Sequence, residues 1–339
     1  GPRTSVSVFH VSYGTSIIMT QKVPSKIPYV LAYDLGGTKV AVGIVNSKGK
    51  ILEEIRVPTV FAEGKDAVIR QLAELGKTLI SRHPKVRRVG IASAGPLDPE
   101  KGVLLDPTNF ASAAGTWGKV PLARLLSQKL KRPVYLENDA AAAMLAEHWI
   151  GAAKHYDNAM ILTLGTGLGT GVISNGNLLR AGRGLHPEAG HVIINSDDTS
   201  ALCGCGNTGC AEAYLSGRNF TRRNQARFSK QSPDLELDAK SMAELARKGD
   251  REAIAAFDEY AEMMAVAIQN YAVIYCPEIV VFTGSFAQTS DLFLGTTRKR
   301  LEVLLARRRV GIDLMPKLAV SSLHNEAGLI GGAYIAFTR

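Results

Sequence analysis

The residues with the clearest chemical potential are one histidine and a group of cysteines in the middle of the chain. His191 is followed by Cys203, Cys205 and Cys210. A histidine nitrogen and three thiolates complete the tetrahedral ligand set of structural zinc, so this number and spacing predict a Cys3His zinc site. The cysteines could instead form a disulfide or be small apolar residues in a turn, although their odd number argues against pairing. Cys276 is isolated and is expected in the core.

Two glutamates accompany this cluster. Glu188 lies three residues before the histidine, and Glu212 lies two residues after the last cysteine. One metal could therefore fix two carboxylates in space together with their loop, which is a way to build a polar ligand site.

Glycine-rich turns offer a second kind of site. Leu35-Gly-Gly-Thr38 and Gly165–Gly171 each follow an apolar strand. Backbone N–H groups that no side chain obstructs can bind phosphate oxygens, although neither turn matches the P-loop pattern. Asp34 precedes the first turn and would repel a phosphate unless a cation mediated, so we expect it to hold hydrated Mg²⁺. An Asx turn that caps the loop is the alternative interpretation.

Polar side chains also follow the predicted strand Val134–Leu136. Transfer of a phosphoryl group to a hydroxyl needs a carboxylate that orients the acceptor and takes its proton, and Asp139 can do this while Asn138 holds a neighbouring hydroxyl. Asp139 is also expected at the N-cap of a helix that runs to Glu147, where the helix N-terminus would keep it ionised.

These residues are positioned by a pattern that occurs twice. An apolar strand, a glycine turn, a second strand and a hairpin turn run from Tyr29 to Lys48-Gly49, and the same order recurs from Met160 to Asn177. The recurrence predicts a duplicated α/β fold with the ligand between its halves.

Further elements are predicted from periodicity and turn residues. We expect helices near 67–81 and 122–130, a mostly helical segment over 215–275 that is interrupted at 229–238, and strands over 86–93 and 277–283. The last helix opens after Asn325 and carries the small residues of 327–333, which would let another helix approach closely. We expect this helix to pack at a hinge.

Composition limits the class of protein. The 339 residues are enough for two domains, and no apolar run approaches the length of a membrane span. Residues 1–19 make a poor signal peptide, so a cytoplasmic location is predicted, and residues 1–28 are treated as an extension that is in part a tag. The net charge of +9 includes clusters at 298–300 and 307–309, but Leu301, Val303, Leu304 and Leu305 interrupt them as in an amphipathic helix. A solvated helix face is therefore favoured over nucleic-acid binding, and attraction of an anionic phosphate donor is a second interpretation.

Together these motifs resemble the ROK family of sugar kinases and sugar-responsive repressors, within the sugar kinase, actin and Hsp70 superfamily. The resemblance covers the chain from Tyr29 to the C-terminus. It implies a two-lobed, duplicated, actin-like (ribonuclease H-like) α/β fold with a ligand cleft between the lobes and a structural zinc site. It also implies a small domain of residues 29–138 plus 325–339 and a large domain of residues 139–324 that carries the zinc.

The resemblance assigns roles residue by residue. Asp34-Leu-Gly-Gly-Thr-Lys39 is similar to the family's first phosphate loop, Leu164–Gly171 to the second, and Gly284-Ser285 to the adenosine turn. The implied nucleotide-binding residues are Asp34, Gly36, Gly37, Thr38, Lys39, Gly165, Thr166, Gly167, Gly284 and Ser285.

The acceptor side is assigned in the same way. Gly90–Asp98 resembles a sugar loop that contributes Gly95, and Leu136-Glu-Asn-Asp139-Ala resembles the catalytic segment, which makes Asp139 the base and Asn138 a sugar ligand. In the zinc module, the resemblance implies that the histidine binds zinc through one nitrogen and sugar through the other, while two glutamates receive sugar hydroxyls. The implied sugar-binding residues are Gly95, Asn138, Asp139, Glu188, His191 and Glu212.

The chain departs from the family pattern in three places. Ala141 stands where the family often has a second asparagine, and Gly284-Ser285 replaces a double glycine, which leaves nucleotide affinity in doubt. The spacing from His191 to Cys203 is slightly long, and we expect an extra surface loop at 195–200 to absorb it.

The sequence thus predicts a Mg-ATP-dependent kinase of the 6-hydroxyl of a hexose, with glucose favoured, structural Zn²⁺, and a homodimeric assembly implied by the resemblance. A kinase of fructose, mannose, N-acetylglucosamine or N-acetylmannosamine, or one that uses polyphosphate, is the alternative. A sugar-sensing regulator is disfavoured, since family repressors carry an N-terminal DNA-binding domain and only 28 residues precede the first strand here.

Overall fold

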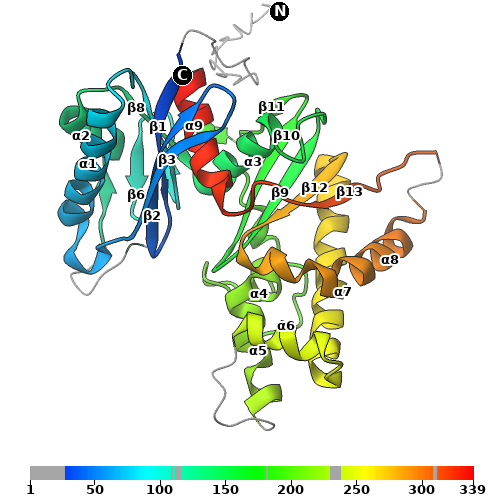
Figure 1. Ribbon diagram of the computed structural model, residues 1–339. Coiled ribbons are helices and arrows are strands. Elements are labelled where there is room, and N and C mark those ends of the chain that lie inside the picture. Colours follow the sequence, from blue (N-terminus) through cyan, green and yellow to red (C-terminus); the bar gives the residue numbers. More distant parts are fainter. Residues whose placement is uncertain (1–26, 108–109, 111–115, 181, 230–237, 308–310) are drawn as a thin grey trace, which may run out of the picture.

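The computed structural model describes residues 27–107, 110, 116–180, 182–229, 238–307 and 311–339. These residues form two five-stranded sheets with helices between and outside them (Figure 1). Most of the predicted extension 1–28 and the two arginines at 308 and 309 lie outside the described residues.

Both sheets have the same strand order. The first is ordered β3-β2-β1-β4-β8 and the second β11-β10-β9-β12-β13. In each, the first strand in sequence pairs antiparallel with the second and parallel with the fourth in sequence (β1 with β2 and β4, β9 with β10 and β12). The duplication predicted from the sequence is therefore present in the sheets. The strands are β1 Tyr29–Leu35, β2 Lys39–Asn46, β3 Ile51–Pro58, β4 Val89–Ser93, β8 Val134–Asn138, β9 Ala159–Leu164, β10 Leu168–Ser174, β11 Asn177–Leu178, β12 Ile279–Thr283 and β13 Lys317–Val320.

A small third sheet and nine helices complete the described part of the chain. The third sheet joins β5 Leu97–Asp98, β6 Val103–Leu105 and β7 Lys119–Val120. The helices are α1 Lys65–Arg82, α2 Leu122–Leu130, α3 Asp139–Trp149, α4 Ala211–Leu215, α5 Gly217–Ser229, α6 Ala239–Arg247, α7 Arg251–Tyr275, α8 Leu294–Leu305 and α9 Ala327–Thr338.

The second glycine turn is shorter than predicted. Only residues 165–167 form the turn, because β10 begins at Leu168 and its glycines pair with β9. Gly171 serves helix packing, since a Cβ there would lie 2.7 Å from Met144 Cβ and 2.8 Å from the Ala140 carbonyl oxygen of α3. A glycine within a strand here marks a close approach and not a loop.

Each sheet is covered on both faces, so most residues of its central strands are buried. On β1, Leu31, Tyr33 and Leu35 face the core with α1 and α2, while Val30 and Ala32 face α9. On β9, the alternation repeats: Met160 faces the core formed with α4–α7, and Ile161 faces α3. Alternate side chains point to opposite faces of a strand, so continuous apolar runs are what two covered faces require.

Helices α3 and α9 pack against each other between the two sheets (Figure 1). Small residues permit this contact: a Cβ on Gly331 would lie 2.0 Å from the Ala142 carbonyl oxygen, and one on Gly90 would lie 1.9 Å from that of Gly332. The prediction that the last helix packs closely against another helix is confirmed.

Two further predictions have clear outcomes. On α8 the cationic residues Arg298 and Lys299 are exposed while Leu301 and Leu305 are buried, which confirms the solvated basic face, although Val303 is 63% exposed.

The prediction that Cys276 lies in the core is wrong. It is exposed, because it follows α7 as the C-cap residue in the left-handed region at φ 47°, where the chain leaves the helix.

None of the described helices is both long enough and apolar enough to cross a bilayer.

Candidate active site

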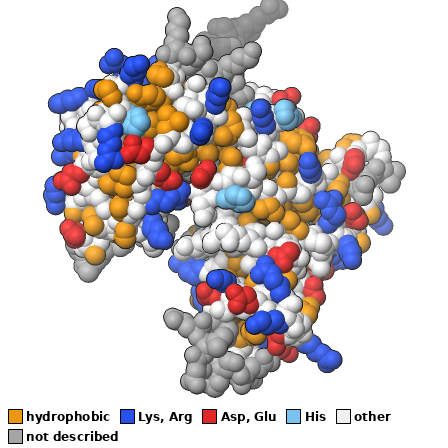
Figure 2. Space-filling model, viewed as in Figure 1, with side chains coloured by type: hydrophobic (Ala, Val, Ile, Leu, Met, Phe, Trp, Pro, Cys, Tyr) orange, Lys and Arg blue, Asp and Glu red, His pale blue; other side chains and the backbone are white. Residues whose placement is uncertain are grey.

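Two carboxylates from different strands meet at the edge where the parallel strands of the first sheet end. Asp34 is the penultimate residue of β1, and Asp139 begins α3 directly after β8. Both strands run parallel to β4, which lies between them, so their carboxyl ends share one edge of the sheet. Figure 2 shows a notch in the molecular surface between the first half and the helical part of the second.

The ionisation of this pair is coupled. Burial raises the pKa of Asp34 to about 7, and the charge of Asp139 adds to this rise while the charge of Arg56 opposes it. Burial also raises the pKa of Asp139, which the backbone N–H of Ala140 opposes. Two like charges held together in a partly desolvated site favour a bound cation or a shared proton.

Asn138, and not Asp139, caps α3. The Asn138 side-chain oxygen accepts hydrogen bonds from the N–H groups of Ala140 (2.9 Å) and Ala141 (3.1 Å). Asp139 is the first helical residue, and its Oδ1 accepts from the N–H of Ala140 at 2.8 Å. The predicted N-cap is therefore wrong by one residue, because β8 extends to Asn138 and brings that residue to the capping geometry. The asparagine amide nitrogen lies toward Gly95, where a Cβ would be 3.5 Å from it.

The first glycine turn is open. The Gly36 N–H donates to the Lys39 carbonyl oxygen at 3.1 Å, and a Cβ on Gly37 would meet no described atom within 4 Å. Residues 37–39 are exposed. The turn thus leaves backbone uncovered at the end of β1, next to Asp34.

The second turn is joined to two other loops. The Gly165 N–H donates to the Gly167 carbonyl oxygen at 3.1 Å, and the Gly165 carbonyl oxygen accepts from the Gly217 N–H at 2.9 Å, which places the start of α5 beside it. Gly284 follows β12 at φ 91°, and a Cβ there would lie 2.5 Å from the Leu164 carbonyl oxygen. The structure therefore brings three of the predicted nucleotide-site glycines to one place.

The remaining predicted nucleotide-site residues are less constrained. Thr38, Lys39, Thr166 and Ser285 are all exposed. Their roles stay predictions.

The four predicted zinc ligands converge. The ligand atoms of His191, Cys203, Cys205 and Cys210 all lie within 4.8 Å of one another, and the thiols are free. Cys205 Sγ lies 3.8 Å from Cys210 Sγ, and Cys203 Sγ lies 3.4 Å from His191 Nδ1. Tetrahedral zinc with usual bond lengths would separate two sulfurs by about 3.8 Å and a sulfur from a nitrogen by about 3.6 Å, so the donor set fits zinc.

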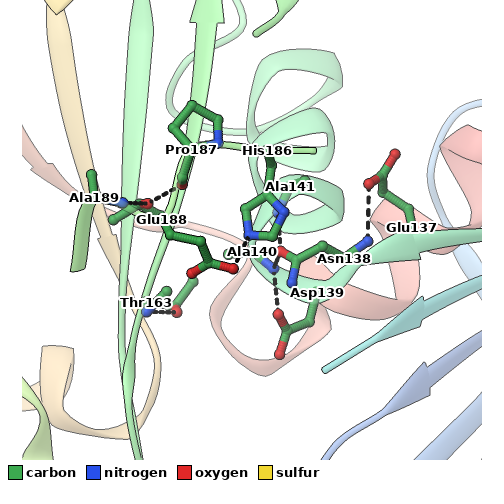
Figure 3. A network of polar contacts seen from close by, with 12 residues as sticks. Glu137, Asn138, Asp139, Ala140, Ala141, Thr163, His186, Pro187, Glu188 and Ala189 are labelled. Carbon is green, nitrogen blue, oxygen red and sulfur yellow. Dashed lines mark hydrogen bonds and ion pairs between the residues drawn. The ribbon is translucent and has the colours of Figure 1, made fainter. Parts of the chain in front are cut away.

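The segment that leads into the cluster carries Glu188 and His186 (Figure 3). Glu188 is exposed, and its Oε1 lies 3.2 Å from Nε2 of His186, whose side chain is only 10% exposed. The hydrogen bond from His186, followed by its charge and that of His191, lowers the pKa of Glu188 although burial opposes this. Figure 3 shows this segment beside Asn138 and Asp139, and the charges of His186 and Glu188 shift the pKa of Asp139 in opposite directions.

Glu212 links the metal cluster to the second glycine turn. Its Oε2 accepts from the Leu168 N–H at 3.0 Å, and its Oε1 lies 3.4 Å from Cys203 Sγ. A Cβ on Gly167 would lie 2.6 Å from Oε2. The segment 195–200 between histidine and cysteines is a loop, as predicted, with mostly exposed residues.

Sequence reasoning missed several charged neighbours. Arg180 forms a buried ion pair with Glu137, whose Oε1 also accepts from the Asn138 N–H at 2.9 Å. His186 stands two residues before Glu188, so its nearness in sequence was a usable signal. Arg180 lies far from Glu137 along the chain, and only the tertiary fold reveals that pair.

The sequence model of the ROK family matches residues 30–339. A curated relative, a glucokinase of Thermotoga maritima, is 34% identical over 316 residues, which cover 90% of this chain and 96% of the relative. An N-acetyl-D-glucosamine kinase of Citrobacter koseri is 31% identical and covers 90% of this chain and 98% of the relative. The solved structure of a ROK family glucokinase from Streptomyces griseus, in complex with glucose and AMPPNP, has a TM-score of 0.76 at 30% identity, with coverage of 91% of this chain and 99% of that one.

Proposed function

The chain belongs to the ROK family, and from this membership and the geometry of the site we propose that it transfers the γ-phosphoryl group of Mg-ATP to the 6-hydroxyl of a hexose, with glucose as the preferred acceptor. The observation that carries the proposal is Asp139: a carboxylate with a raised pKa at the junction of the two halves, beside Asn138 and Glu188. The named activities of the glucokinase relatives support the choice of sugar.

Asp139 acts as the general base. It accepts the proton of the 6-hydroxyl as that oxygen bonds to the γ-phosphorus, while the bond from phosphorus to the bridging oxygen breaks and ADP leaves. A raised pKa suits this task, because a base whose pKa approaches the working pH transfers protons most efficiently. Asn138 and the two glutamates Glu188 and Glu212 hold the other hydroxyls, where a lost hydrogen bond would be costly.

The donor side uses the glycine turns. The N–H groups around Gly37 and Gly165 bind phosphate oxygens, and the turn at Gly284 lies against the adenosine. Asp34 would hold hydrated Mg²⁺, which would neutralise phosphate charge and relieve the repulsion between the two aspartates. Residues 29–138 with 325–339 close on residues 139–324 about the α3–α9 contact and exclude water.

The zinc cluster positions the acceptor. When bound, zinc would hold His191 through Nδ1 and leave its Nε2 for a sugar hydroxyl, because a Cys3His set has no open coordination position for Lewis-acid chemistry. The short distance from Nδ1 to Cys203 Sγ supports this choice of nitrogen.

The test is a coupled ATP-to-ADP assay with Mg²⁺ on a panel of glucose, fructose, mannose, N-acetylglucosamine and N-acetylmannosamine. We expect glucose to give the highest kcat/KM. A clear lead of another sugar contradicts the acceptor but keeps the kinase, and absence of turnover with ATP and with polyphosphate favours the sugar-sensing alternative.

A further inference from the structure

His186 is a nearly buried histidine that no part of the proposed mechanism uses. Its side chain is 10% exposed, and among the described residues its imidazole makes one polar contact, from Nε2 to Oε1 of Glu188 at 3.2 Å. The partner carboxylate is 58% exposed. Figure 3 shows the imidazole between Glu188 and the segment Asn138–Ala140. The imidazole is thus nearly buried, whereas the carboxylate that it contacts is largely exposed.

The backbone on both sides of this pair is fixed. Thr170 of β10, which is 2% exposed, donates from Oγ1 to the Pro187 carbonyl oxygen at 2.8 Å and accepts from the Ala189 N–H at 3.1 Å. Tyr271 of α7 donates to the Ala189 carbonyl oxygen at 2.8 Å, and a Cβ on Gly190 would lie 2.2 Å from the Leu168 carbonyl oxygen. With the main chain clamped, the freedom that remains to Glu188 is that of its own side chain.

Three charged groups face Asp139 from the elements around it. Asp34 approaches from β1, and Glu188 and His186 approach from the segment before the zinc cluster. Burial raises the pKa of Asp139, and the charge of Glu188 adds to this, whereas the charge of His186 is the side-chain influence that lowers it. His186 is therefore placed to act on both acceptor-site carboxylates.

We propose that His186 is a positioning residue of the acceptor site, which holds the carboxylate of Glu188 toward the sugar and, in its protonated form, supplies a cationic neighbour of Asp139. The inference rests on the proposed function, since it assigns the acceptor to this part of the cleft. A preorganised carboxylate loses less rotamer freedom when a sugar hydroxyl donates to it, so the pair strengthens sugar binding without touching the nucleotide.

The test compares His186→Ala with His186→Gln and with His155→Ala, an exposed histidine after α3 that serves as the control. We expect His186→Ala to raise the KM for glucose about tenfold and to leave the KM for ATP unchanged. We also expect the acid limb of kcat to move to higher pH, because Asp139 loses its cationic neighbour and must deprotonate beside Asp34 and Glu188. His186→Gln keeps an N–H for Glu188 and should restore the KM for glucose, but its neutral amide should not restore the acid limb.

A double-variant cycle separates positioning from a general structural role. If His186 acts through Glu188, then His186→Ala adds no further rise in KM to that of Glu188→Gln. Additive effects, equal rises in both KM values with a lowered Tm, or an unshifted acid limb in His186→Ala each overturn the proposal. Failure of the proposed function is recognised separately, because the unsubstituted protein then turns over no hexose.

Discussion

The two glycine turns occupy equivalent places in the duplicated sheets, yet they are equipped differently. The first spans residues 36–39 between the paired residues Leu35 and Val40, and the second spans only 165–167 between Leu164 and Leu168. Before the first turn stands Asp34, whose side chain makes no hydrogen bond with any described residue. Before the second stands Thr163, whose Oγ1 accepts from the Gly169 N–H at 3.1 Å. The same scaffold thus carries a carboxylate without a hydrogen-bond partner in one half and a hydrogen-bonded hydroxyl in the other.

The two halves also differ in the segments that are inserted between their strands. The first half inserts a small sheet and α2 between β4 and β8, while the second inserts the zinc-ligand cluster and α4–α7 between β11 and β12. Under the proposed function, duplication supplies two glycine turns for phosphate, whereas a cation site and an acceptor site are each added to one half. Asp139 begins α3 directly after the last strand of the first sheet, so the proposed base lies next to both.

The largest effect on turnover is expected at Asp139. Asp139→Asn should lower kcat by about 1,000-fold, because general-base catalysis is lost while the shape and the Asn138 cap remain. Glucose binding, measured by calorimetry, should change by less than about threefold, as binding energy resides in the other hydroxyl contacts. Near-normal turnover would remove Asp139 from the mechanism.

The second-largest effect on kcat is expected at Asp34, before the first glycine turn. Asp34→Asn should lower kcat by about 100-fold and raise the Mg²⁺ concentration needed for half-maximal activity, since the carboxylate that holds the hydrated ion is gone. Steady-state kinetics over a Mg²⁺ series provide the measurement. Thr163→Val, at the equivalent place in the second half, is the matched control and should leave the Mg²⁺ requirement unaltered.

The same substitution should stabilise the fold. The pKa of Asp34 rises from 3.8 to about 7 on folding, so its ionisation costs stability that grows as pH rises between these values and is complete above the upper one. Asp34→Asn removes this cost and should raise the Tm near pH 8 by roughly 2–4 °C in the absence of nucleotide, with no gain near pH 3. Glu74→Gln, at an exposed position of α1, is the control for simple loss of a charge. An equal gain at both pH values would contradict the assignment of the cost to Asp34.

Substitution of a predicted zinc-ligand cysteine tests the acceptor site. Cys205→Ser should raise the KM for glucose about 10-fold to 100-fold with little change for ATP, since misplaced ligands disturb His191 and Glu212 and leave the turns intact. Cys276→Ser alters an exposed thiol outside the cluster and should leave the KM for glucose and the KM for ATP unchanged. Zinc content measured by elemental analysis should fall from one ion per chain only in Cys205→Ser.

The glycines should show the smallest effects on turnover. Gly37→Ala and Gly165→Ala meet no described atom within 4 Å of the new Cβ, so the Tm should hold while the KM for ATP rises about threefold to tenfold. Gly284→Ala forces a side chain at φ 91° against the Leu164 carbonyl oxygen and should lower stability by about 1–3 kcal/mol. Thermal unfolding and ATP titrations separate the two classes. A lowered Tm in Gly37→Ala would show that its glycine serves packing.

Local sequence patterns predicted most strands, turns and helices. Strand alternation and glycine turns were enough to find both halves, and the small residues of α9 were enough to find its close contact, because these features depend on neighbours in sequence. Boundaries failed where tertiary packing decided them: Gly169 and Gly171 joined β10 because α3 lies against them, and Asn138 replaced Asp139 as the cap because β8 continues to it.

Long-range pairing could not be predicted. The four predicted zinc ligands come from a short stretch with a typical ligand spacing, so their convergence could be predicted from the sequence. The electrostatic influence of Asp139 on Asp34 and the pair of Arg180 and Glu137 depend on side-chain directions after the sheets assemble. No periodicity or spacing in the chain encodes those directions.

The most direct test of the account is ³¹P nuclear magnetic resonance of a reaction that contains the protein, Mg-ATP and glucose. The account predicts ADP and one new phosphomonoester signal, coupled to the two protons of C6, in equal amounts and without inorganic phosphate. Inorganic phosphate as the only new product, or a phosphoryl group on another sugar oxygen, would contradict a base at Asp139 that directs the 6-hydroxyl to the donor.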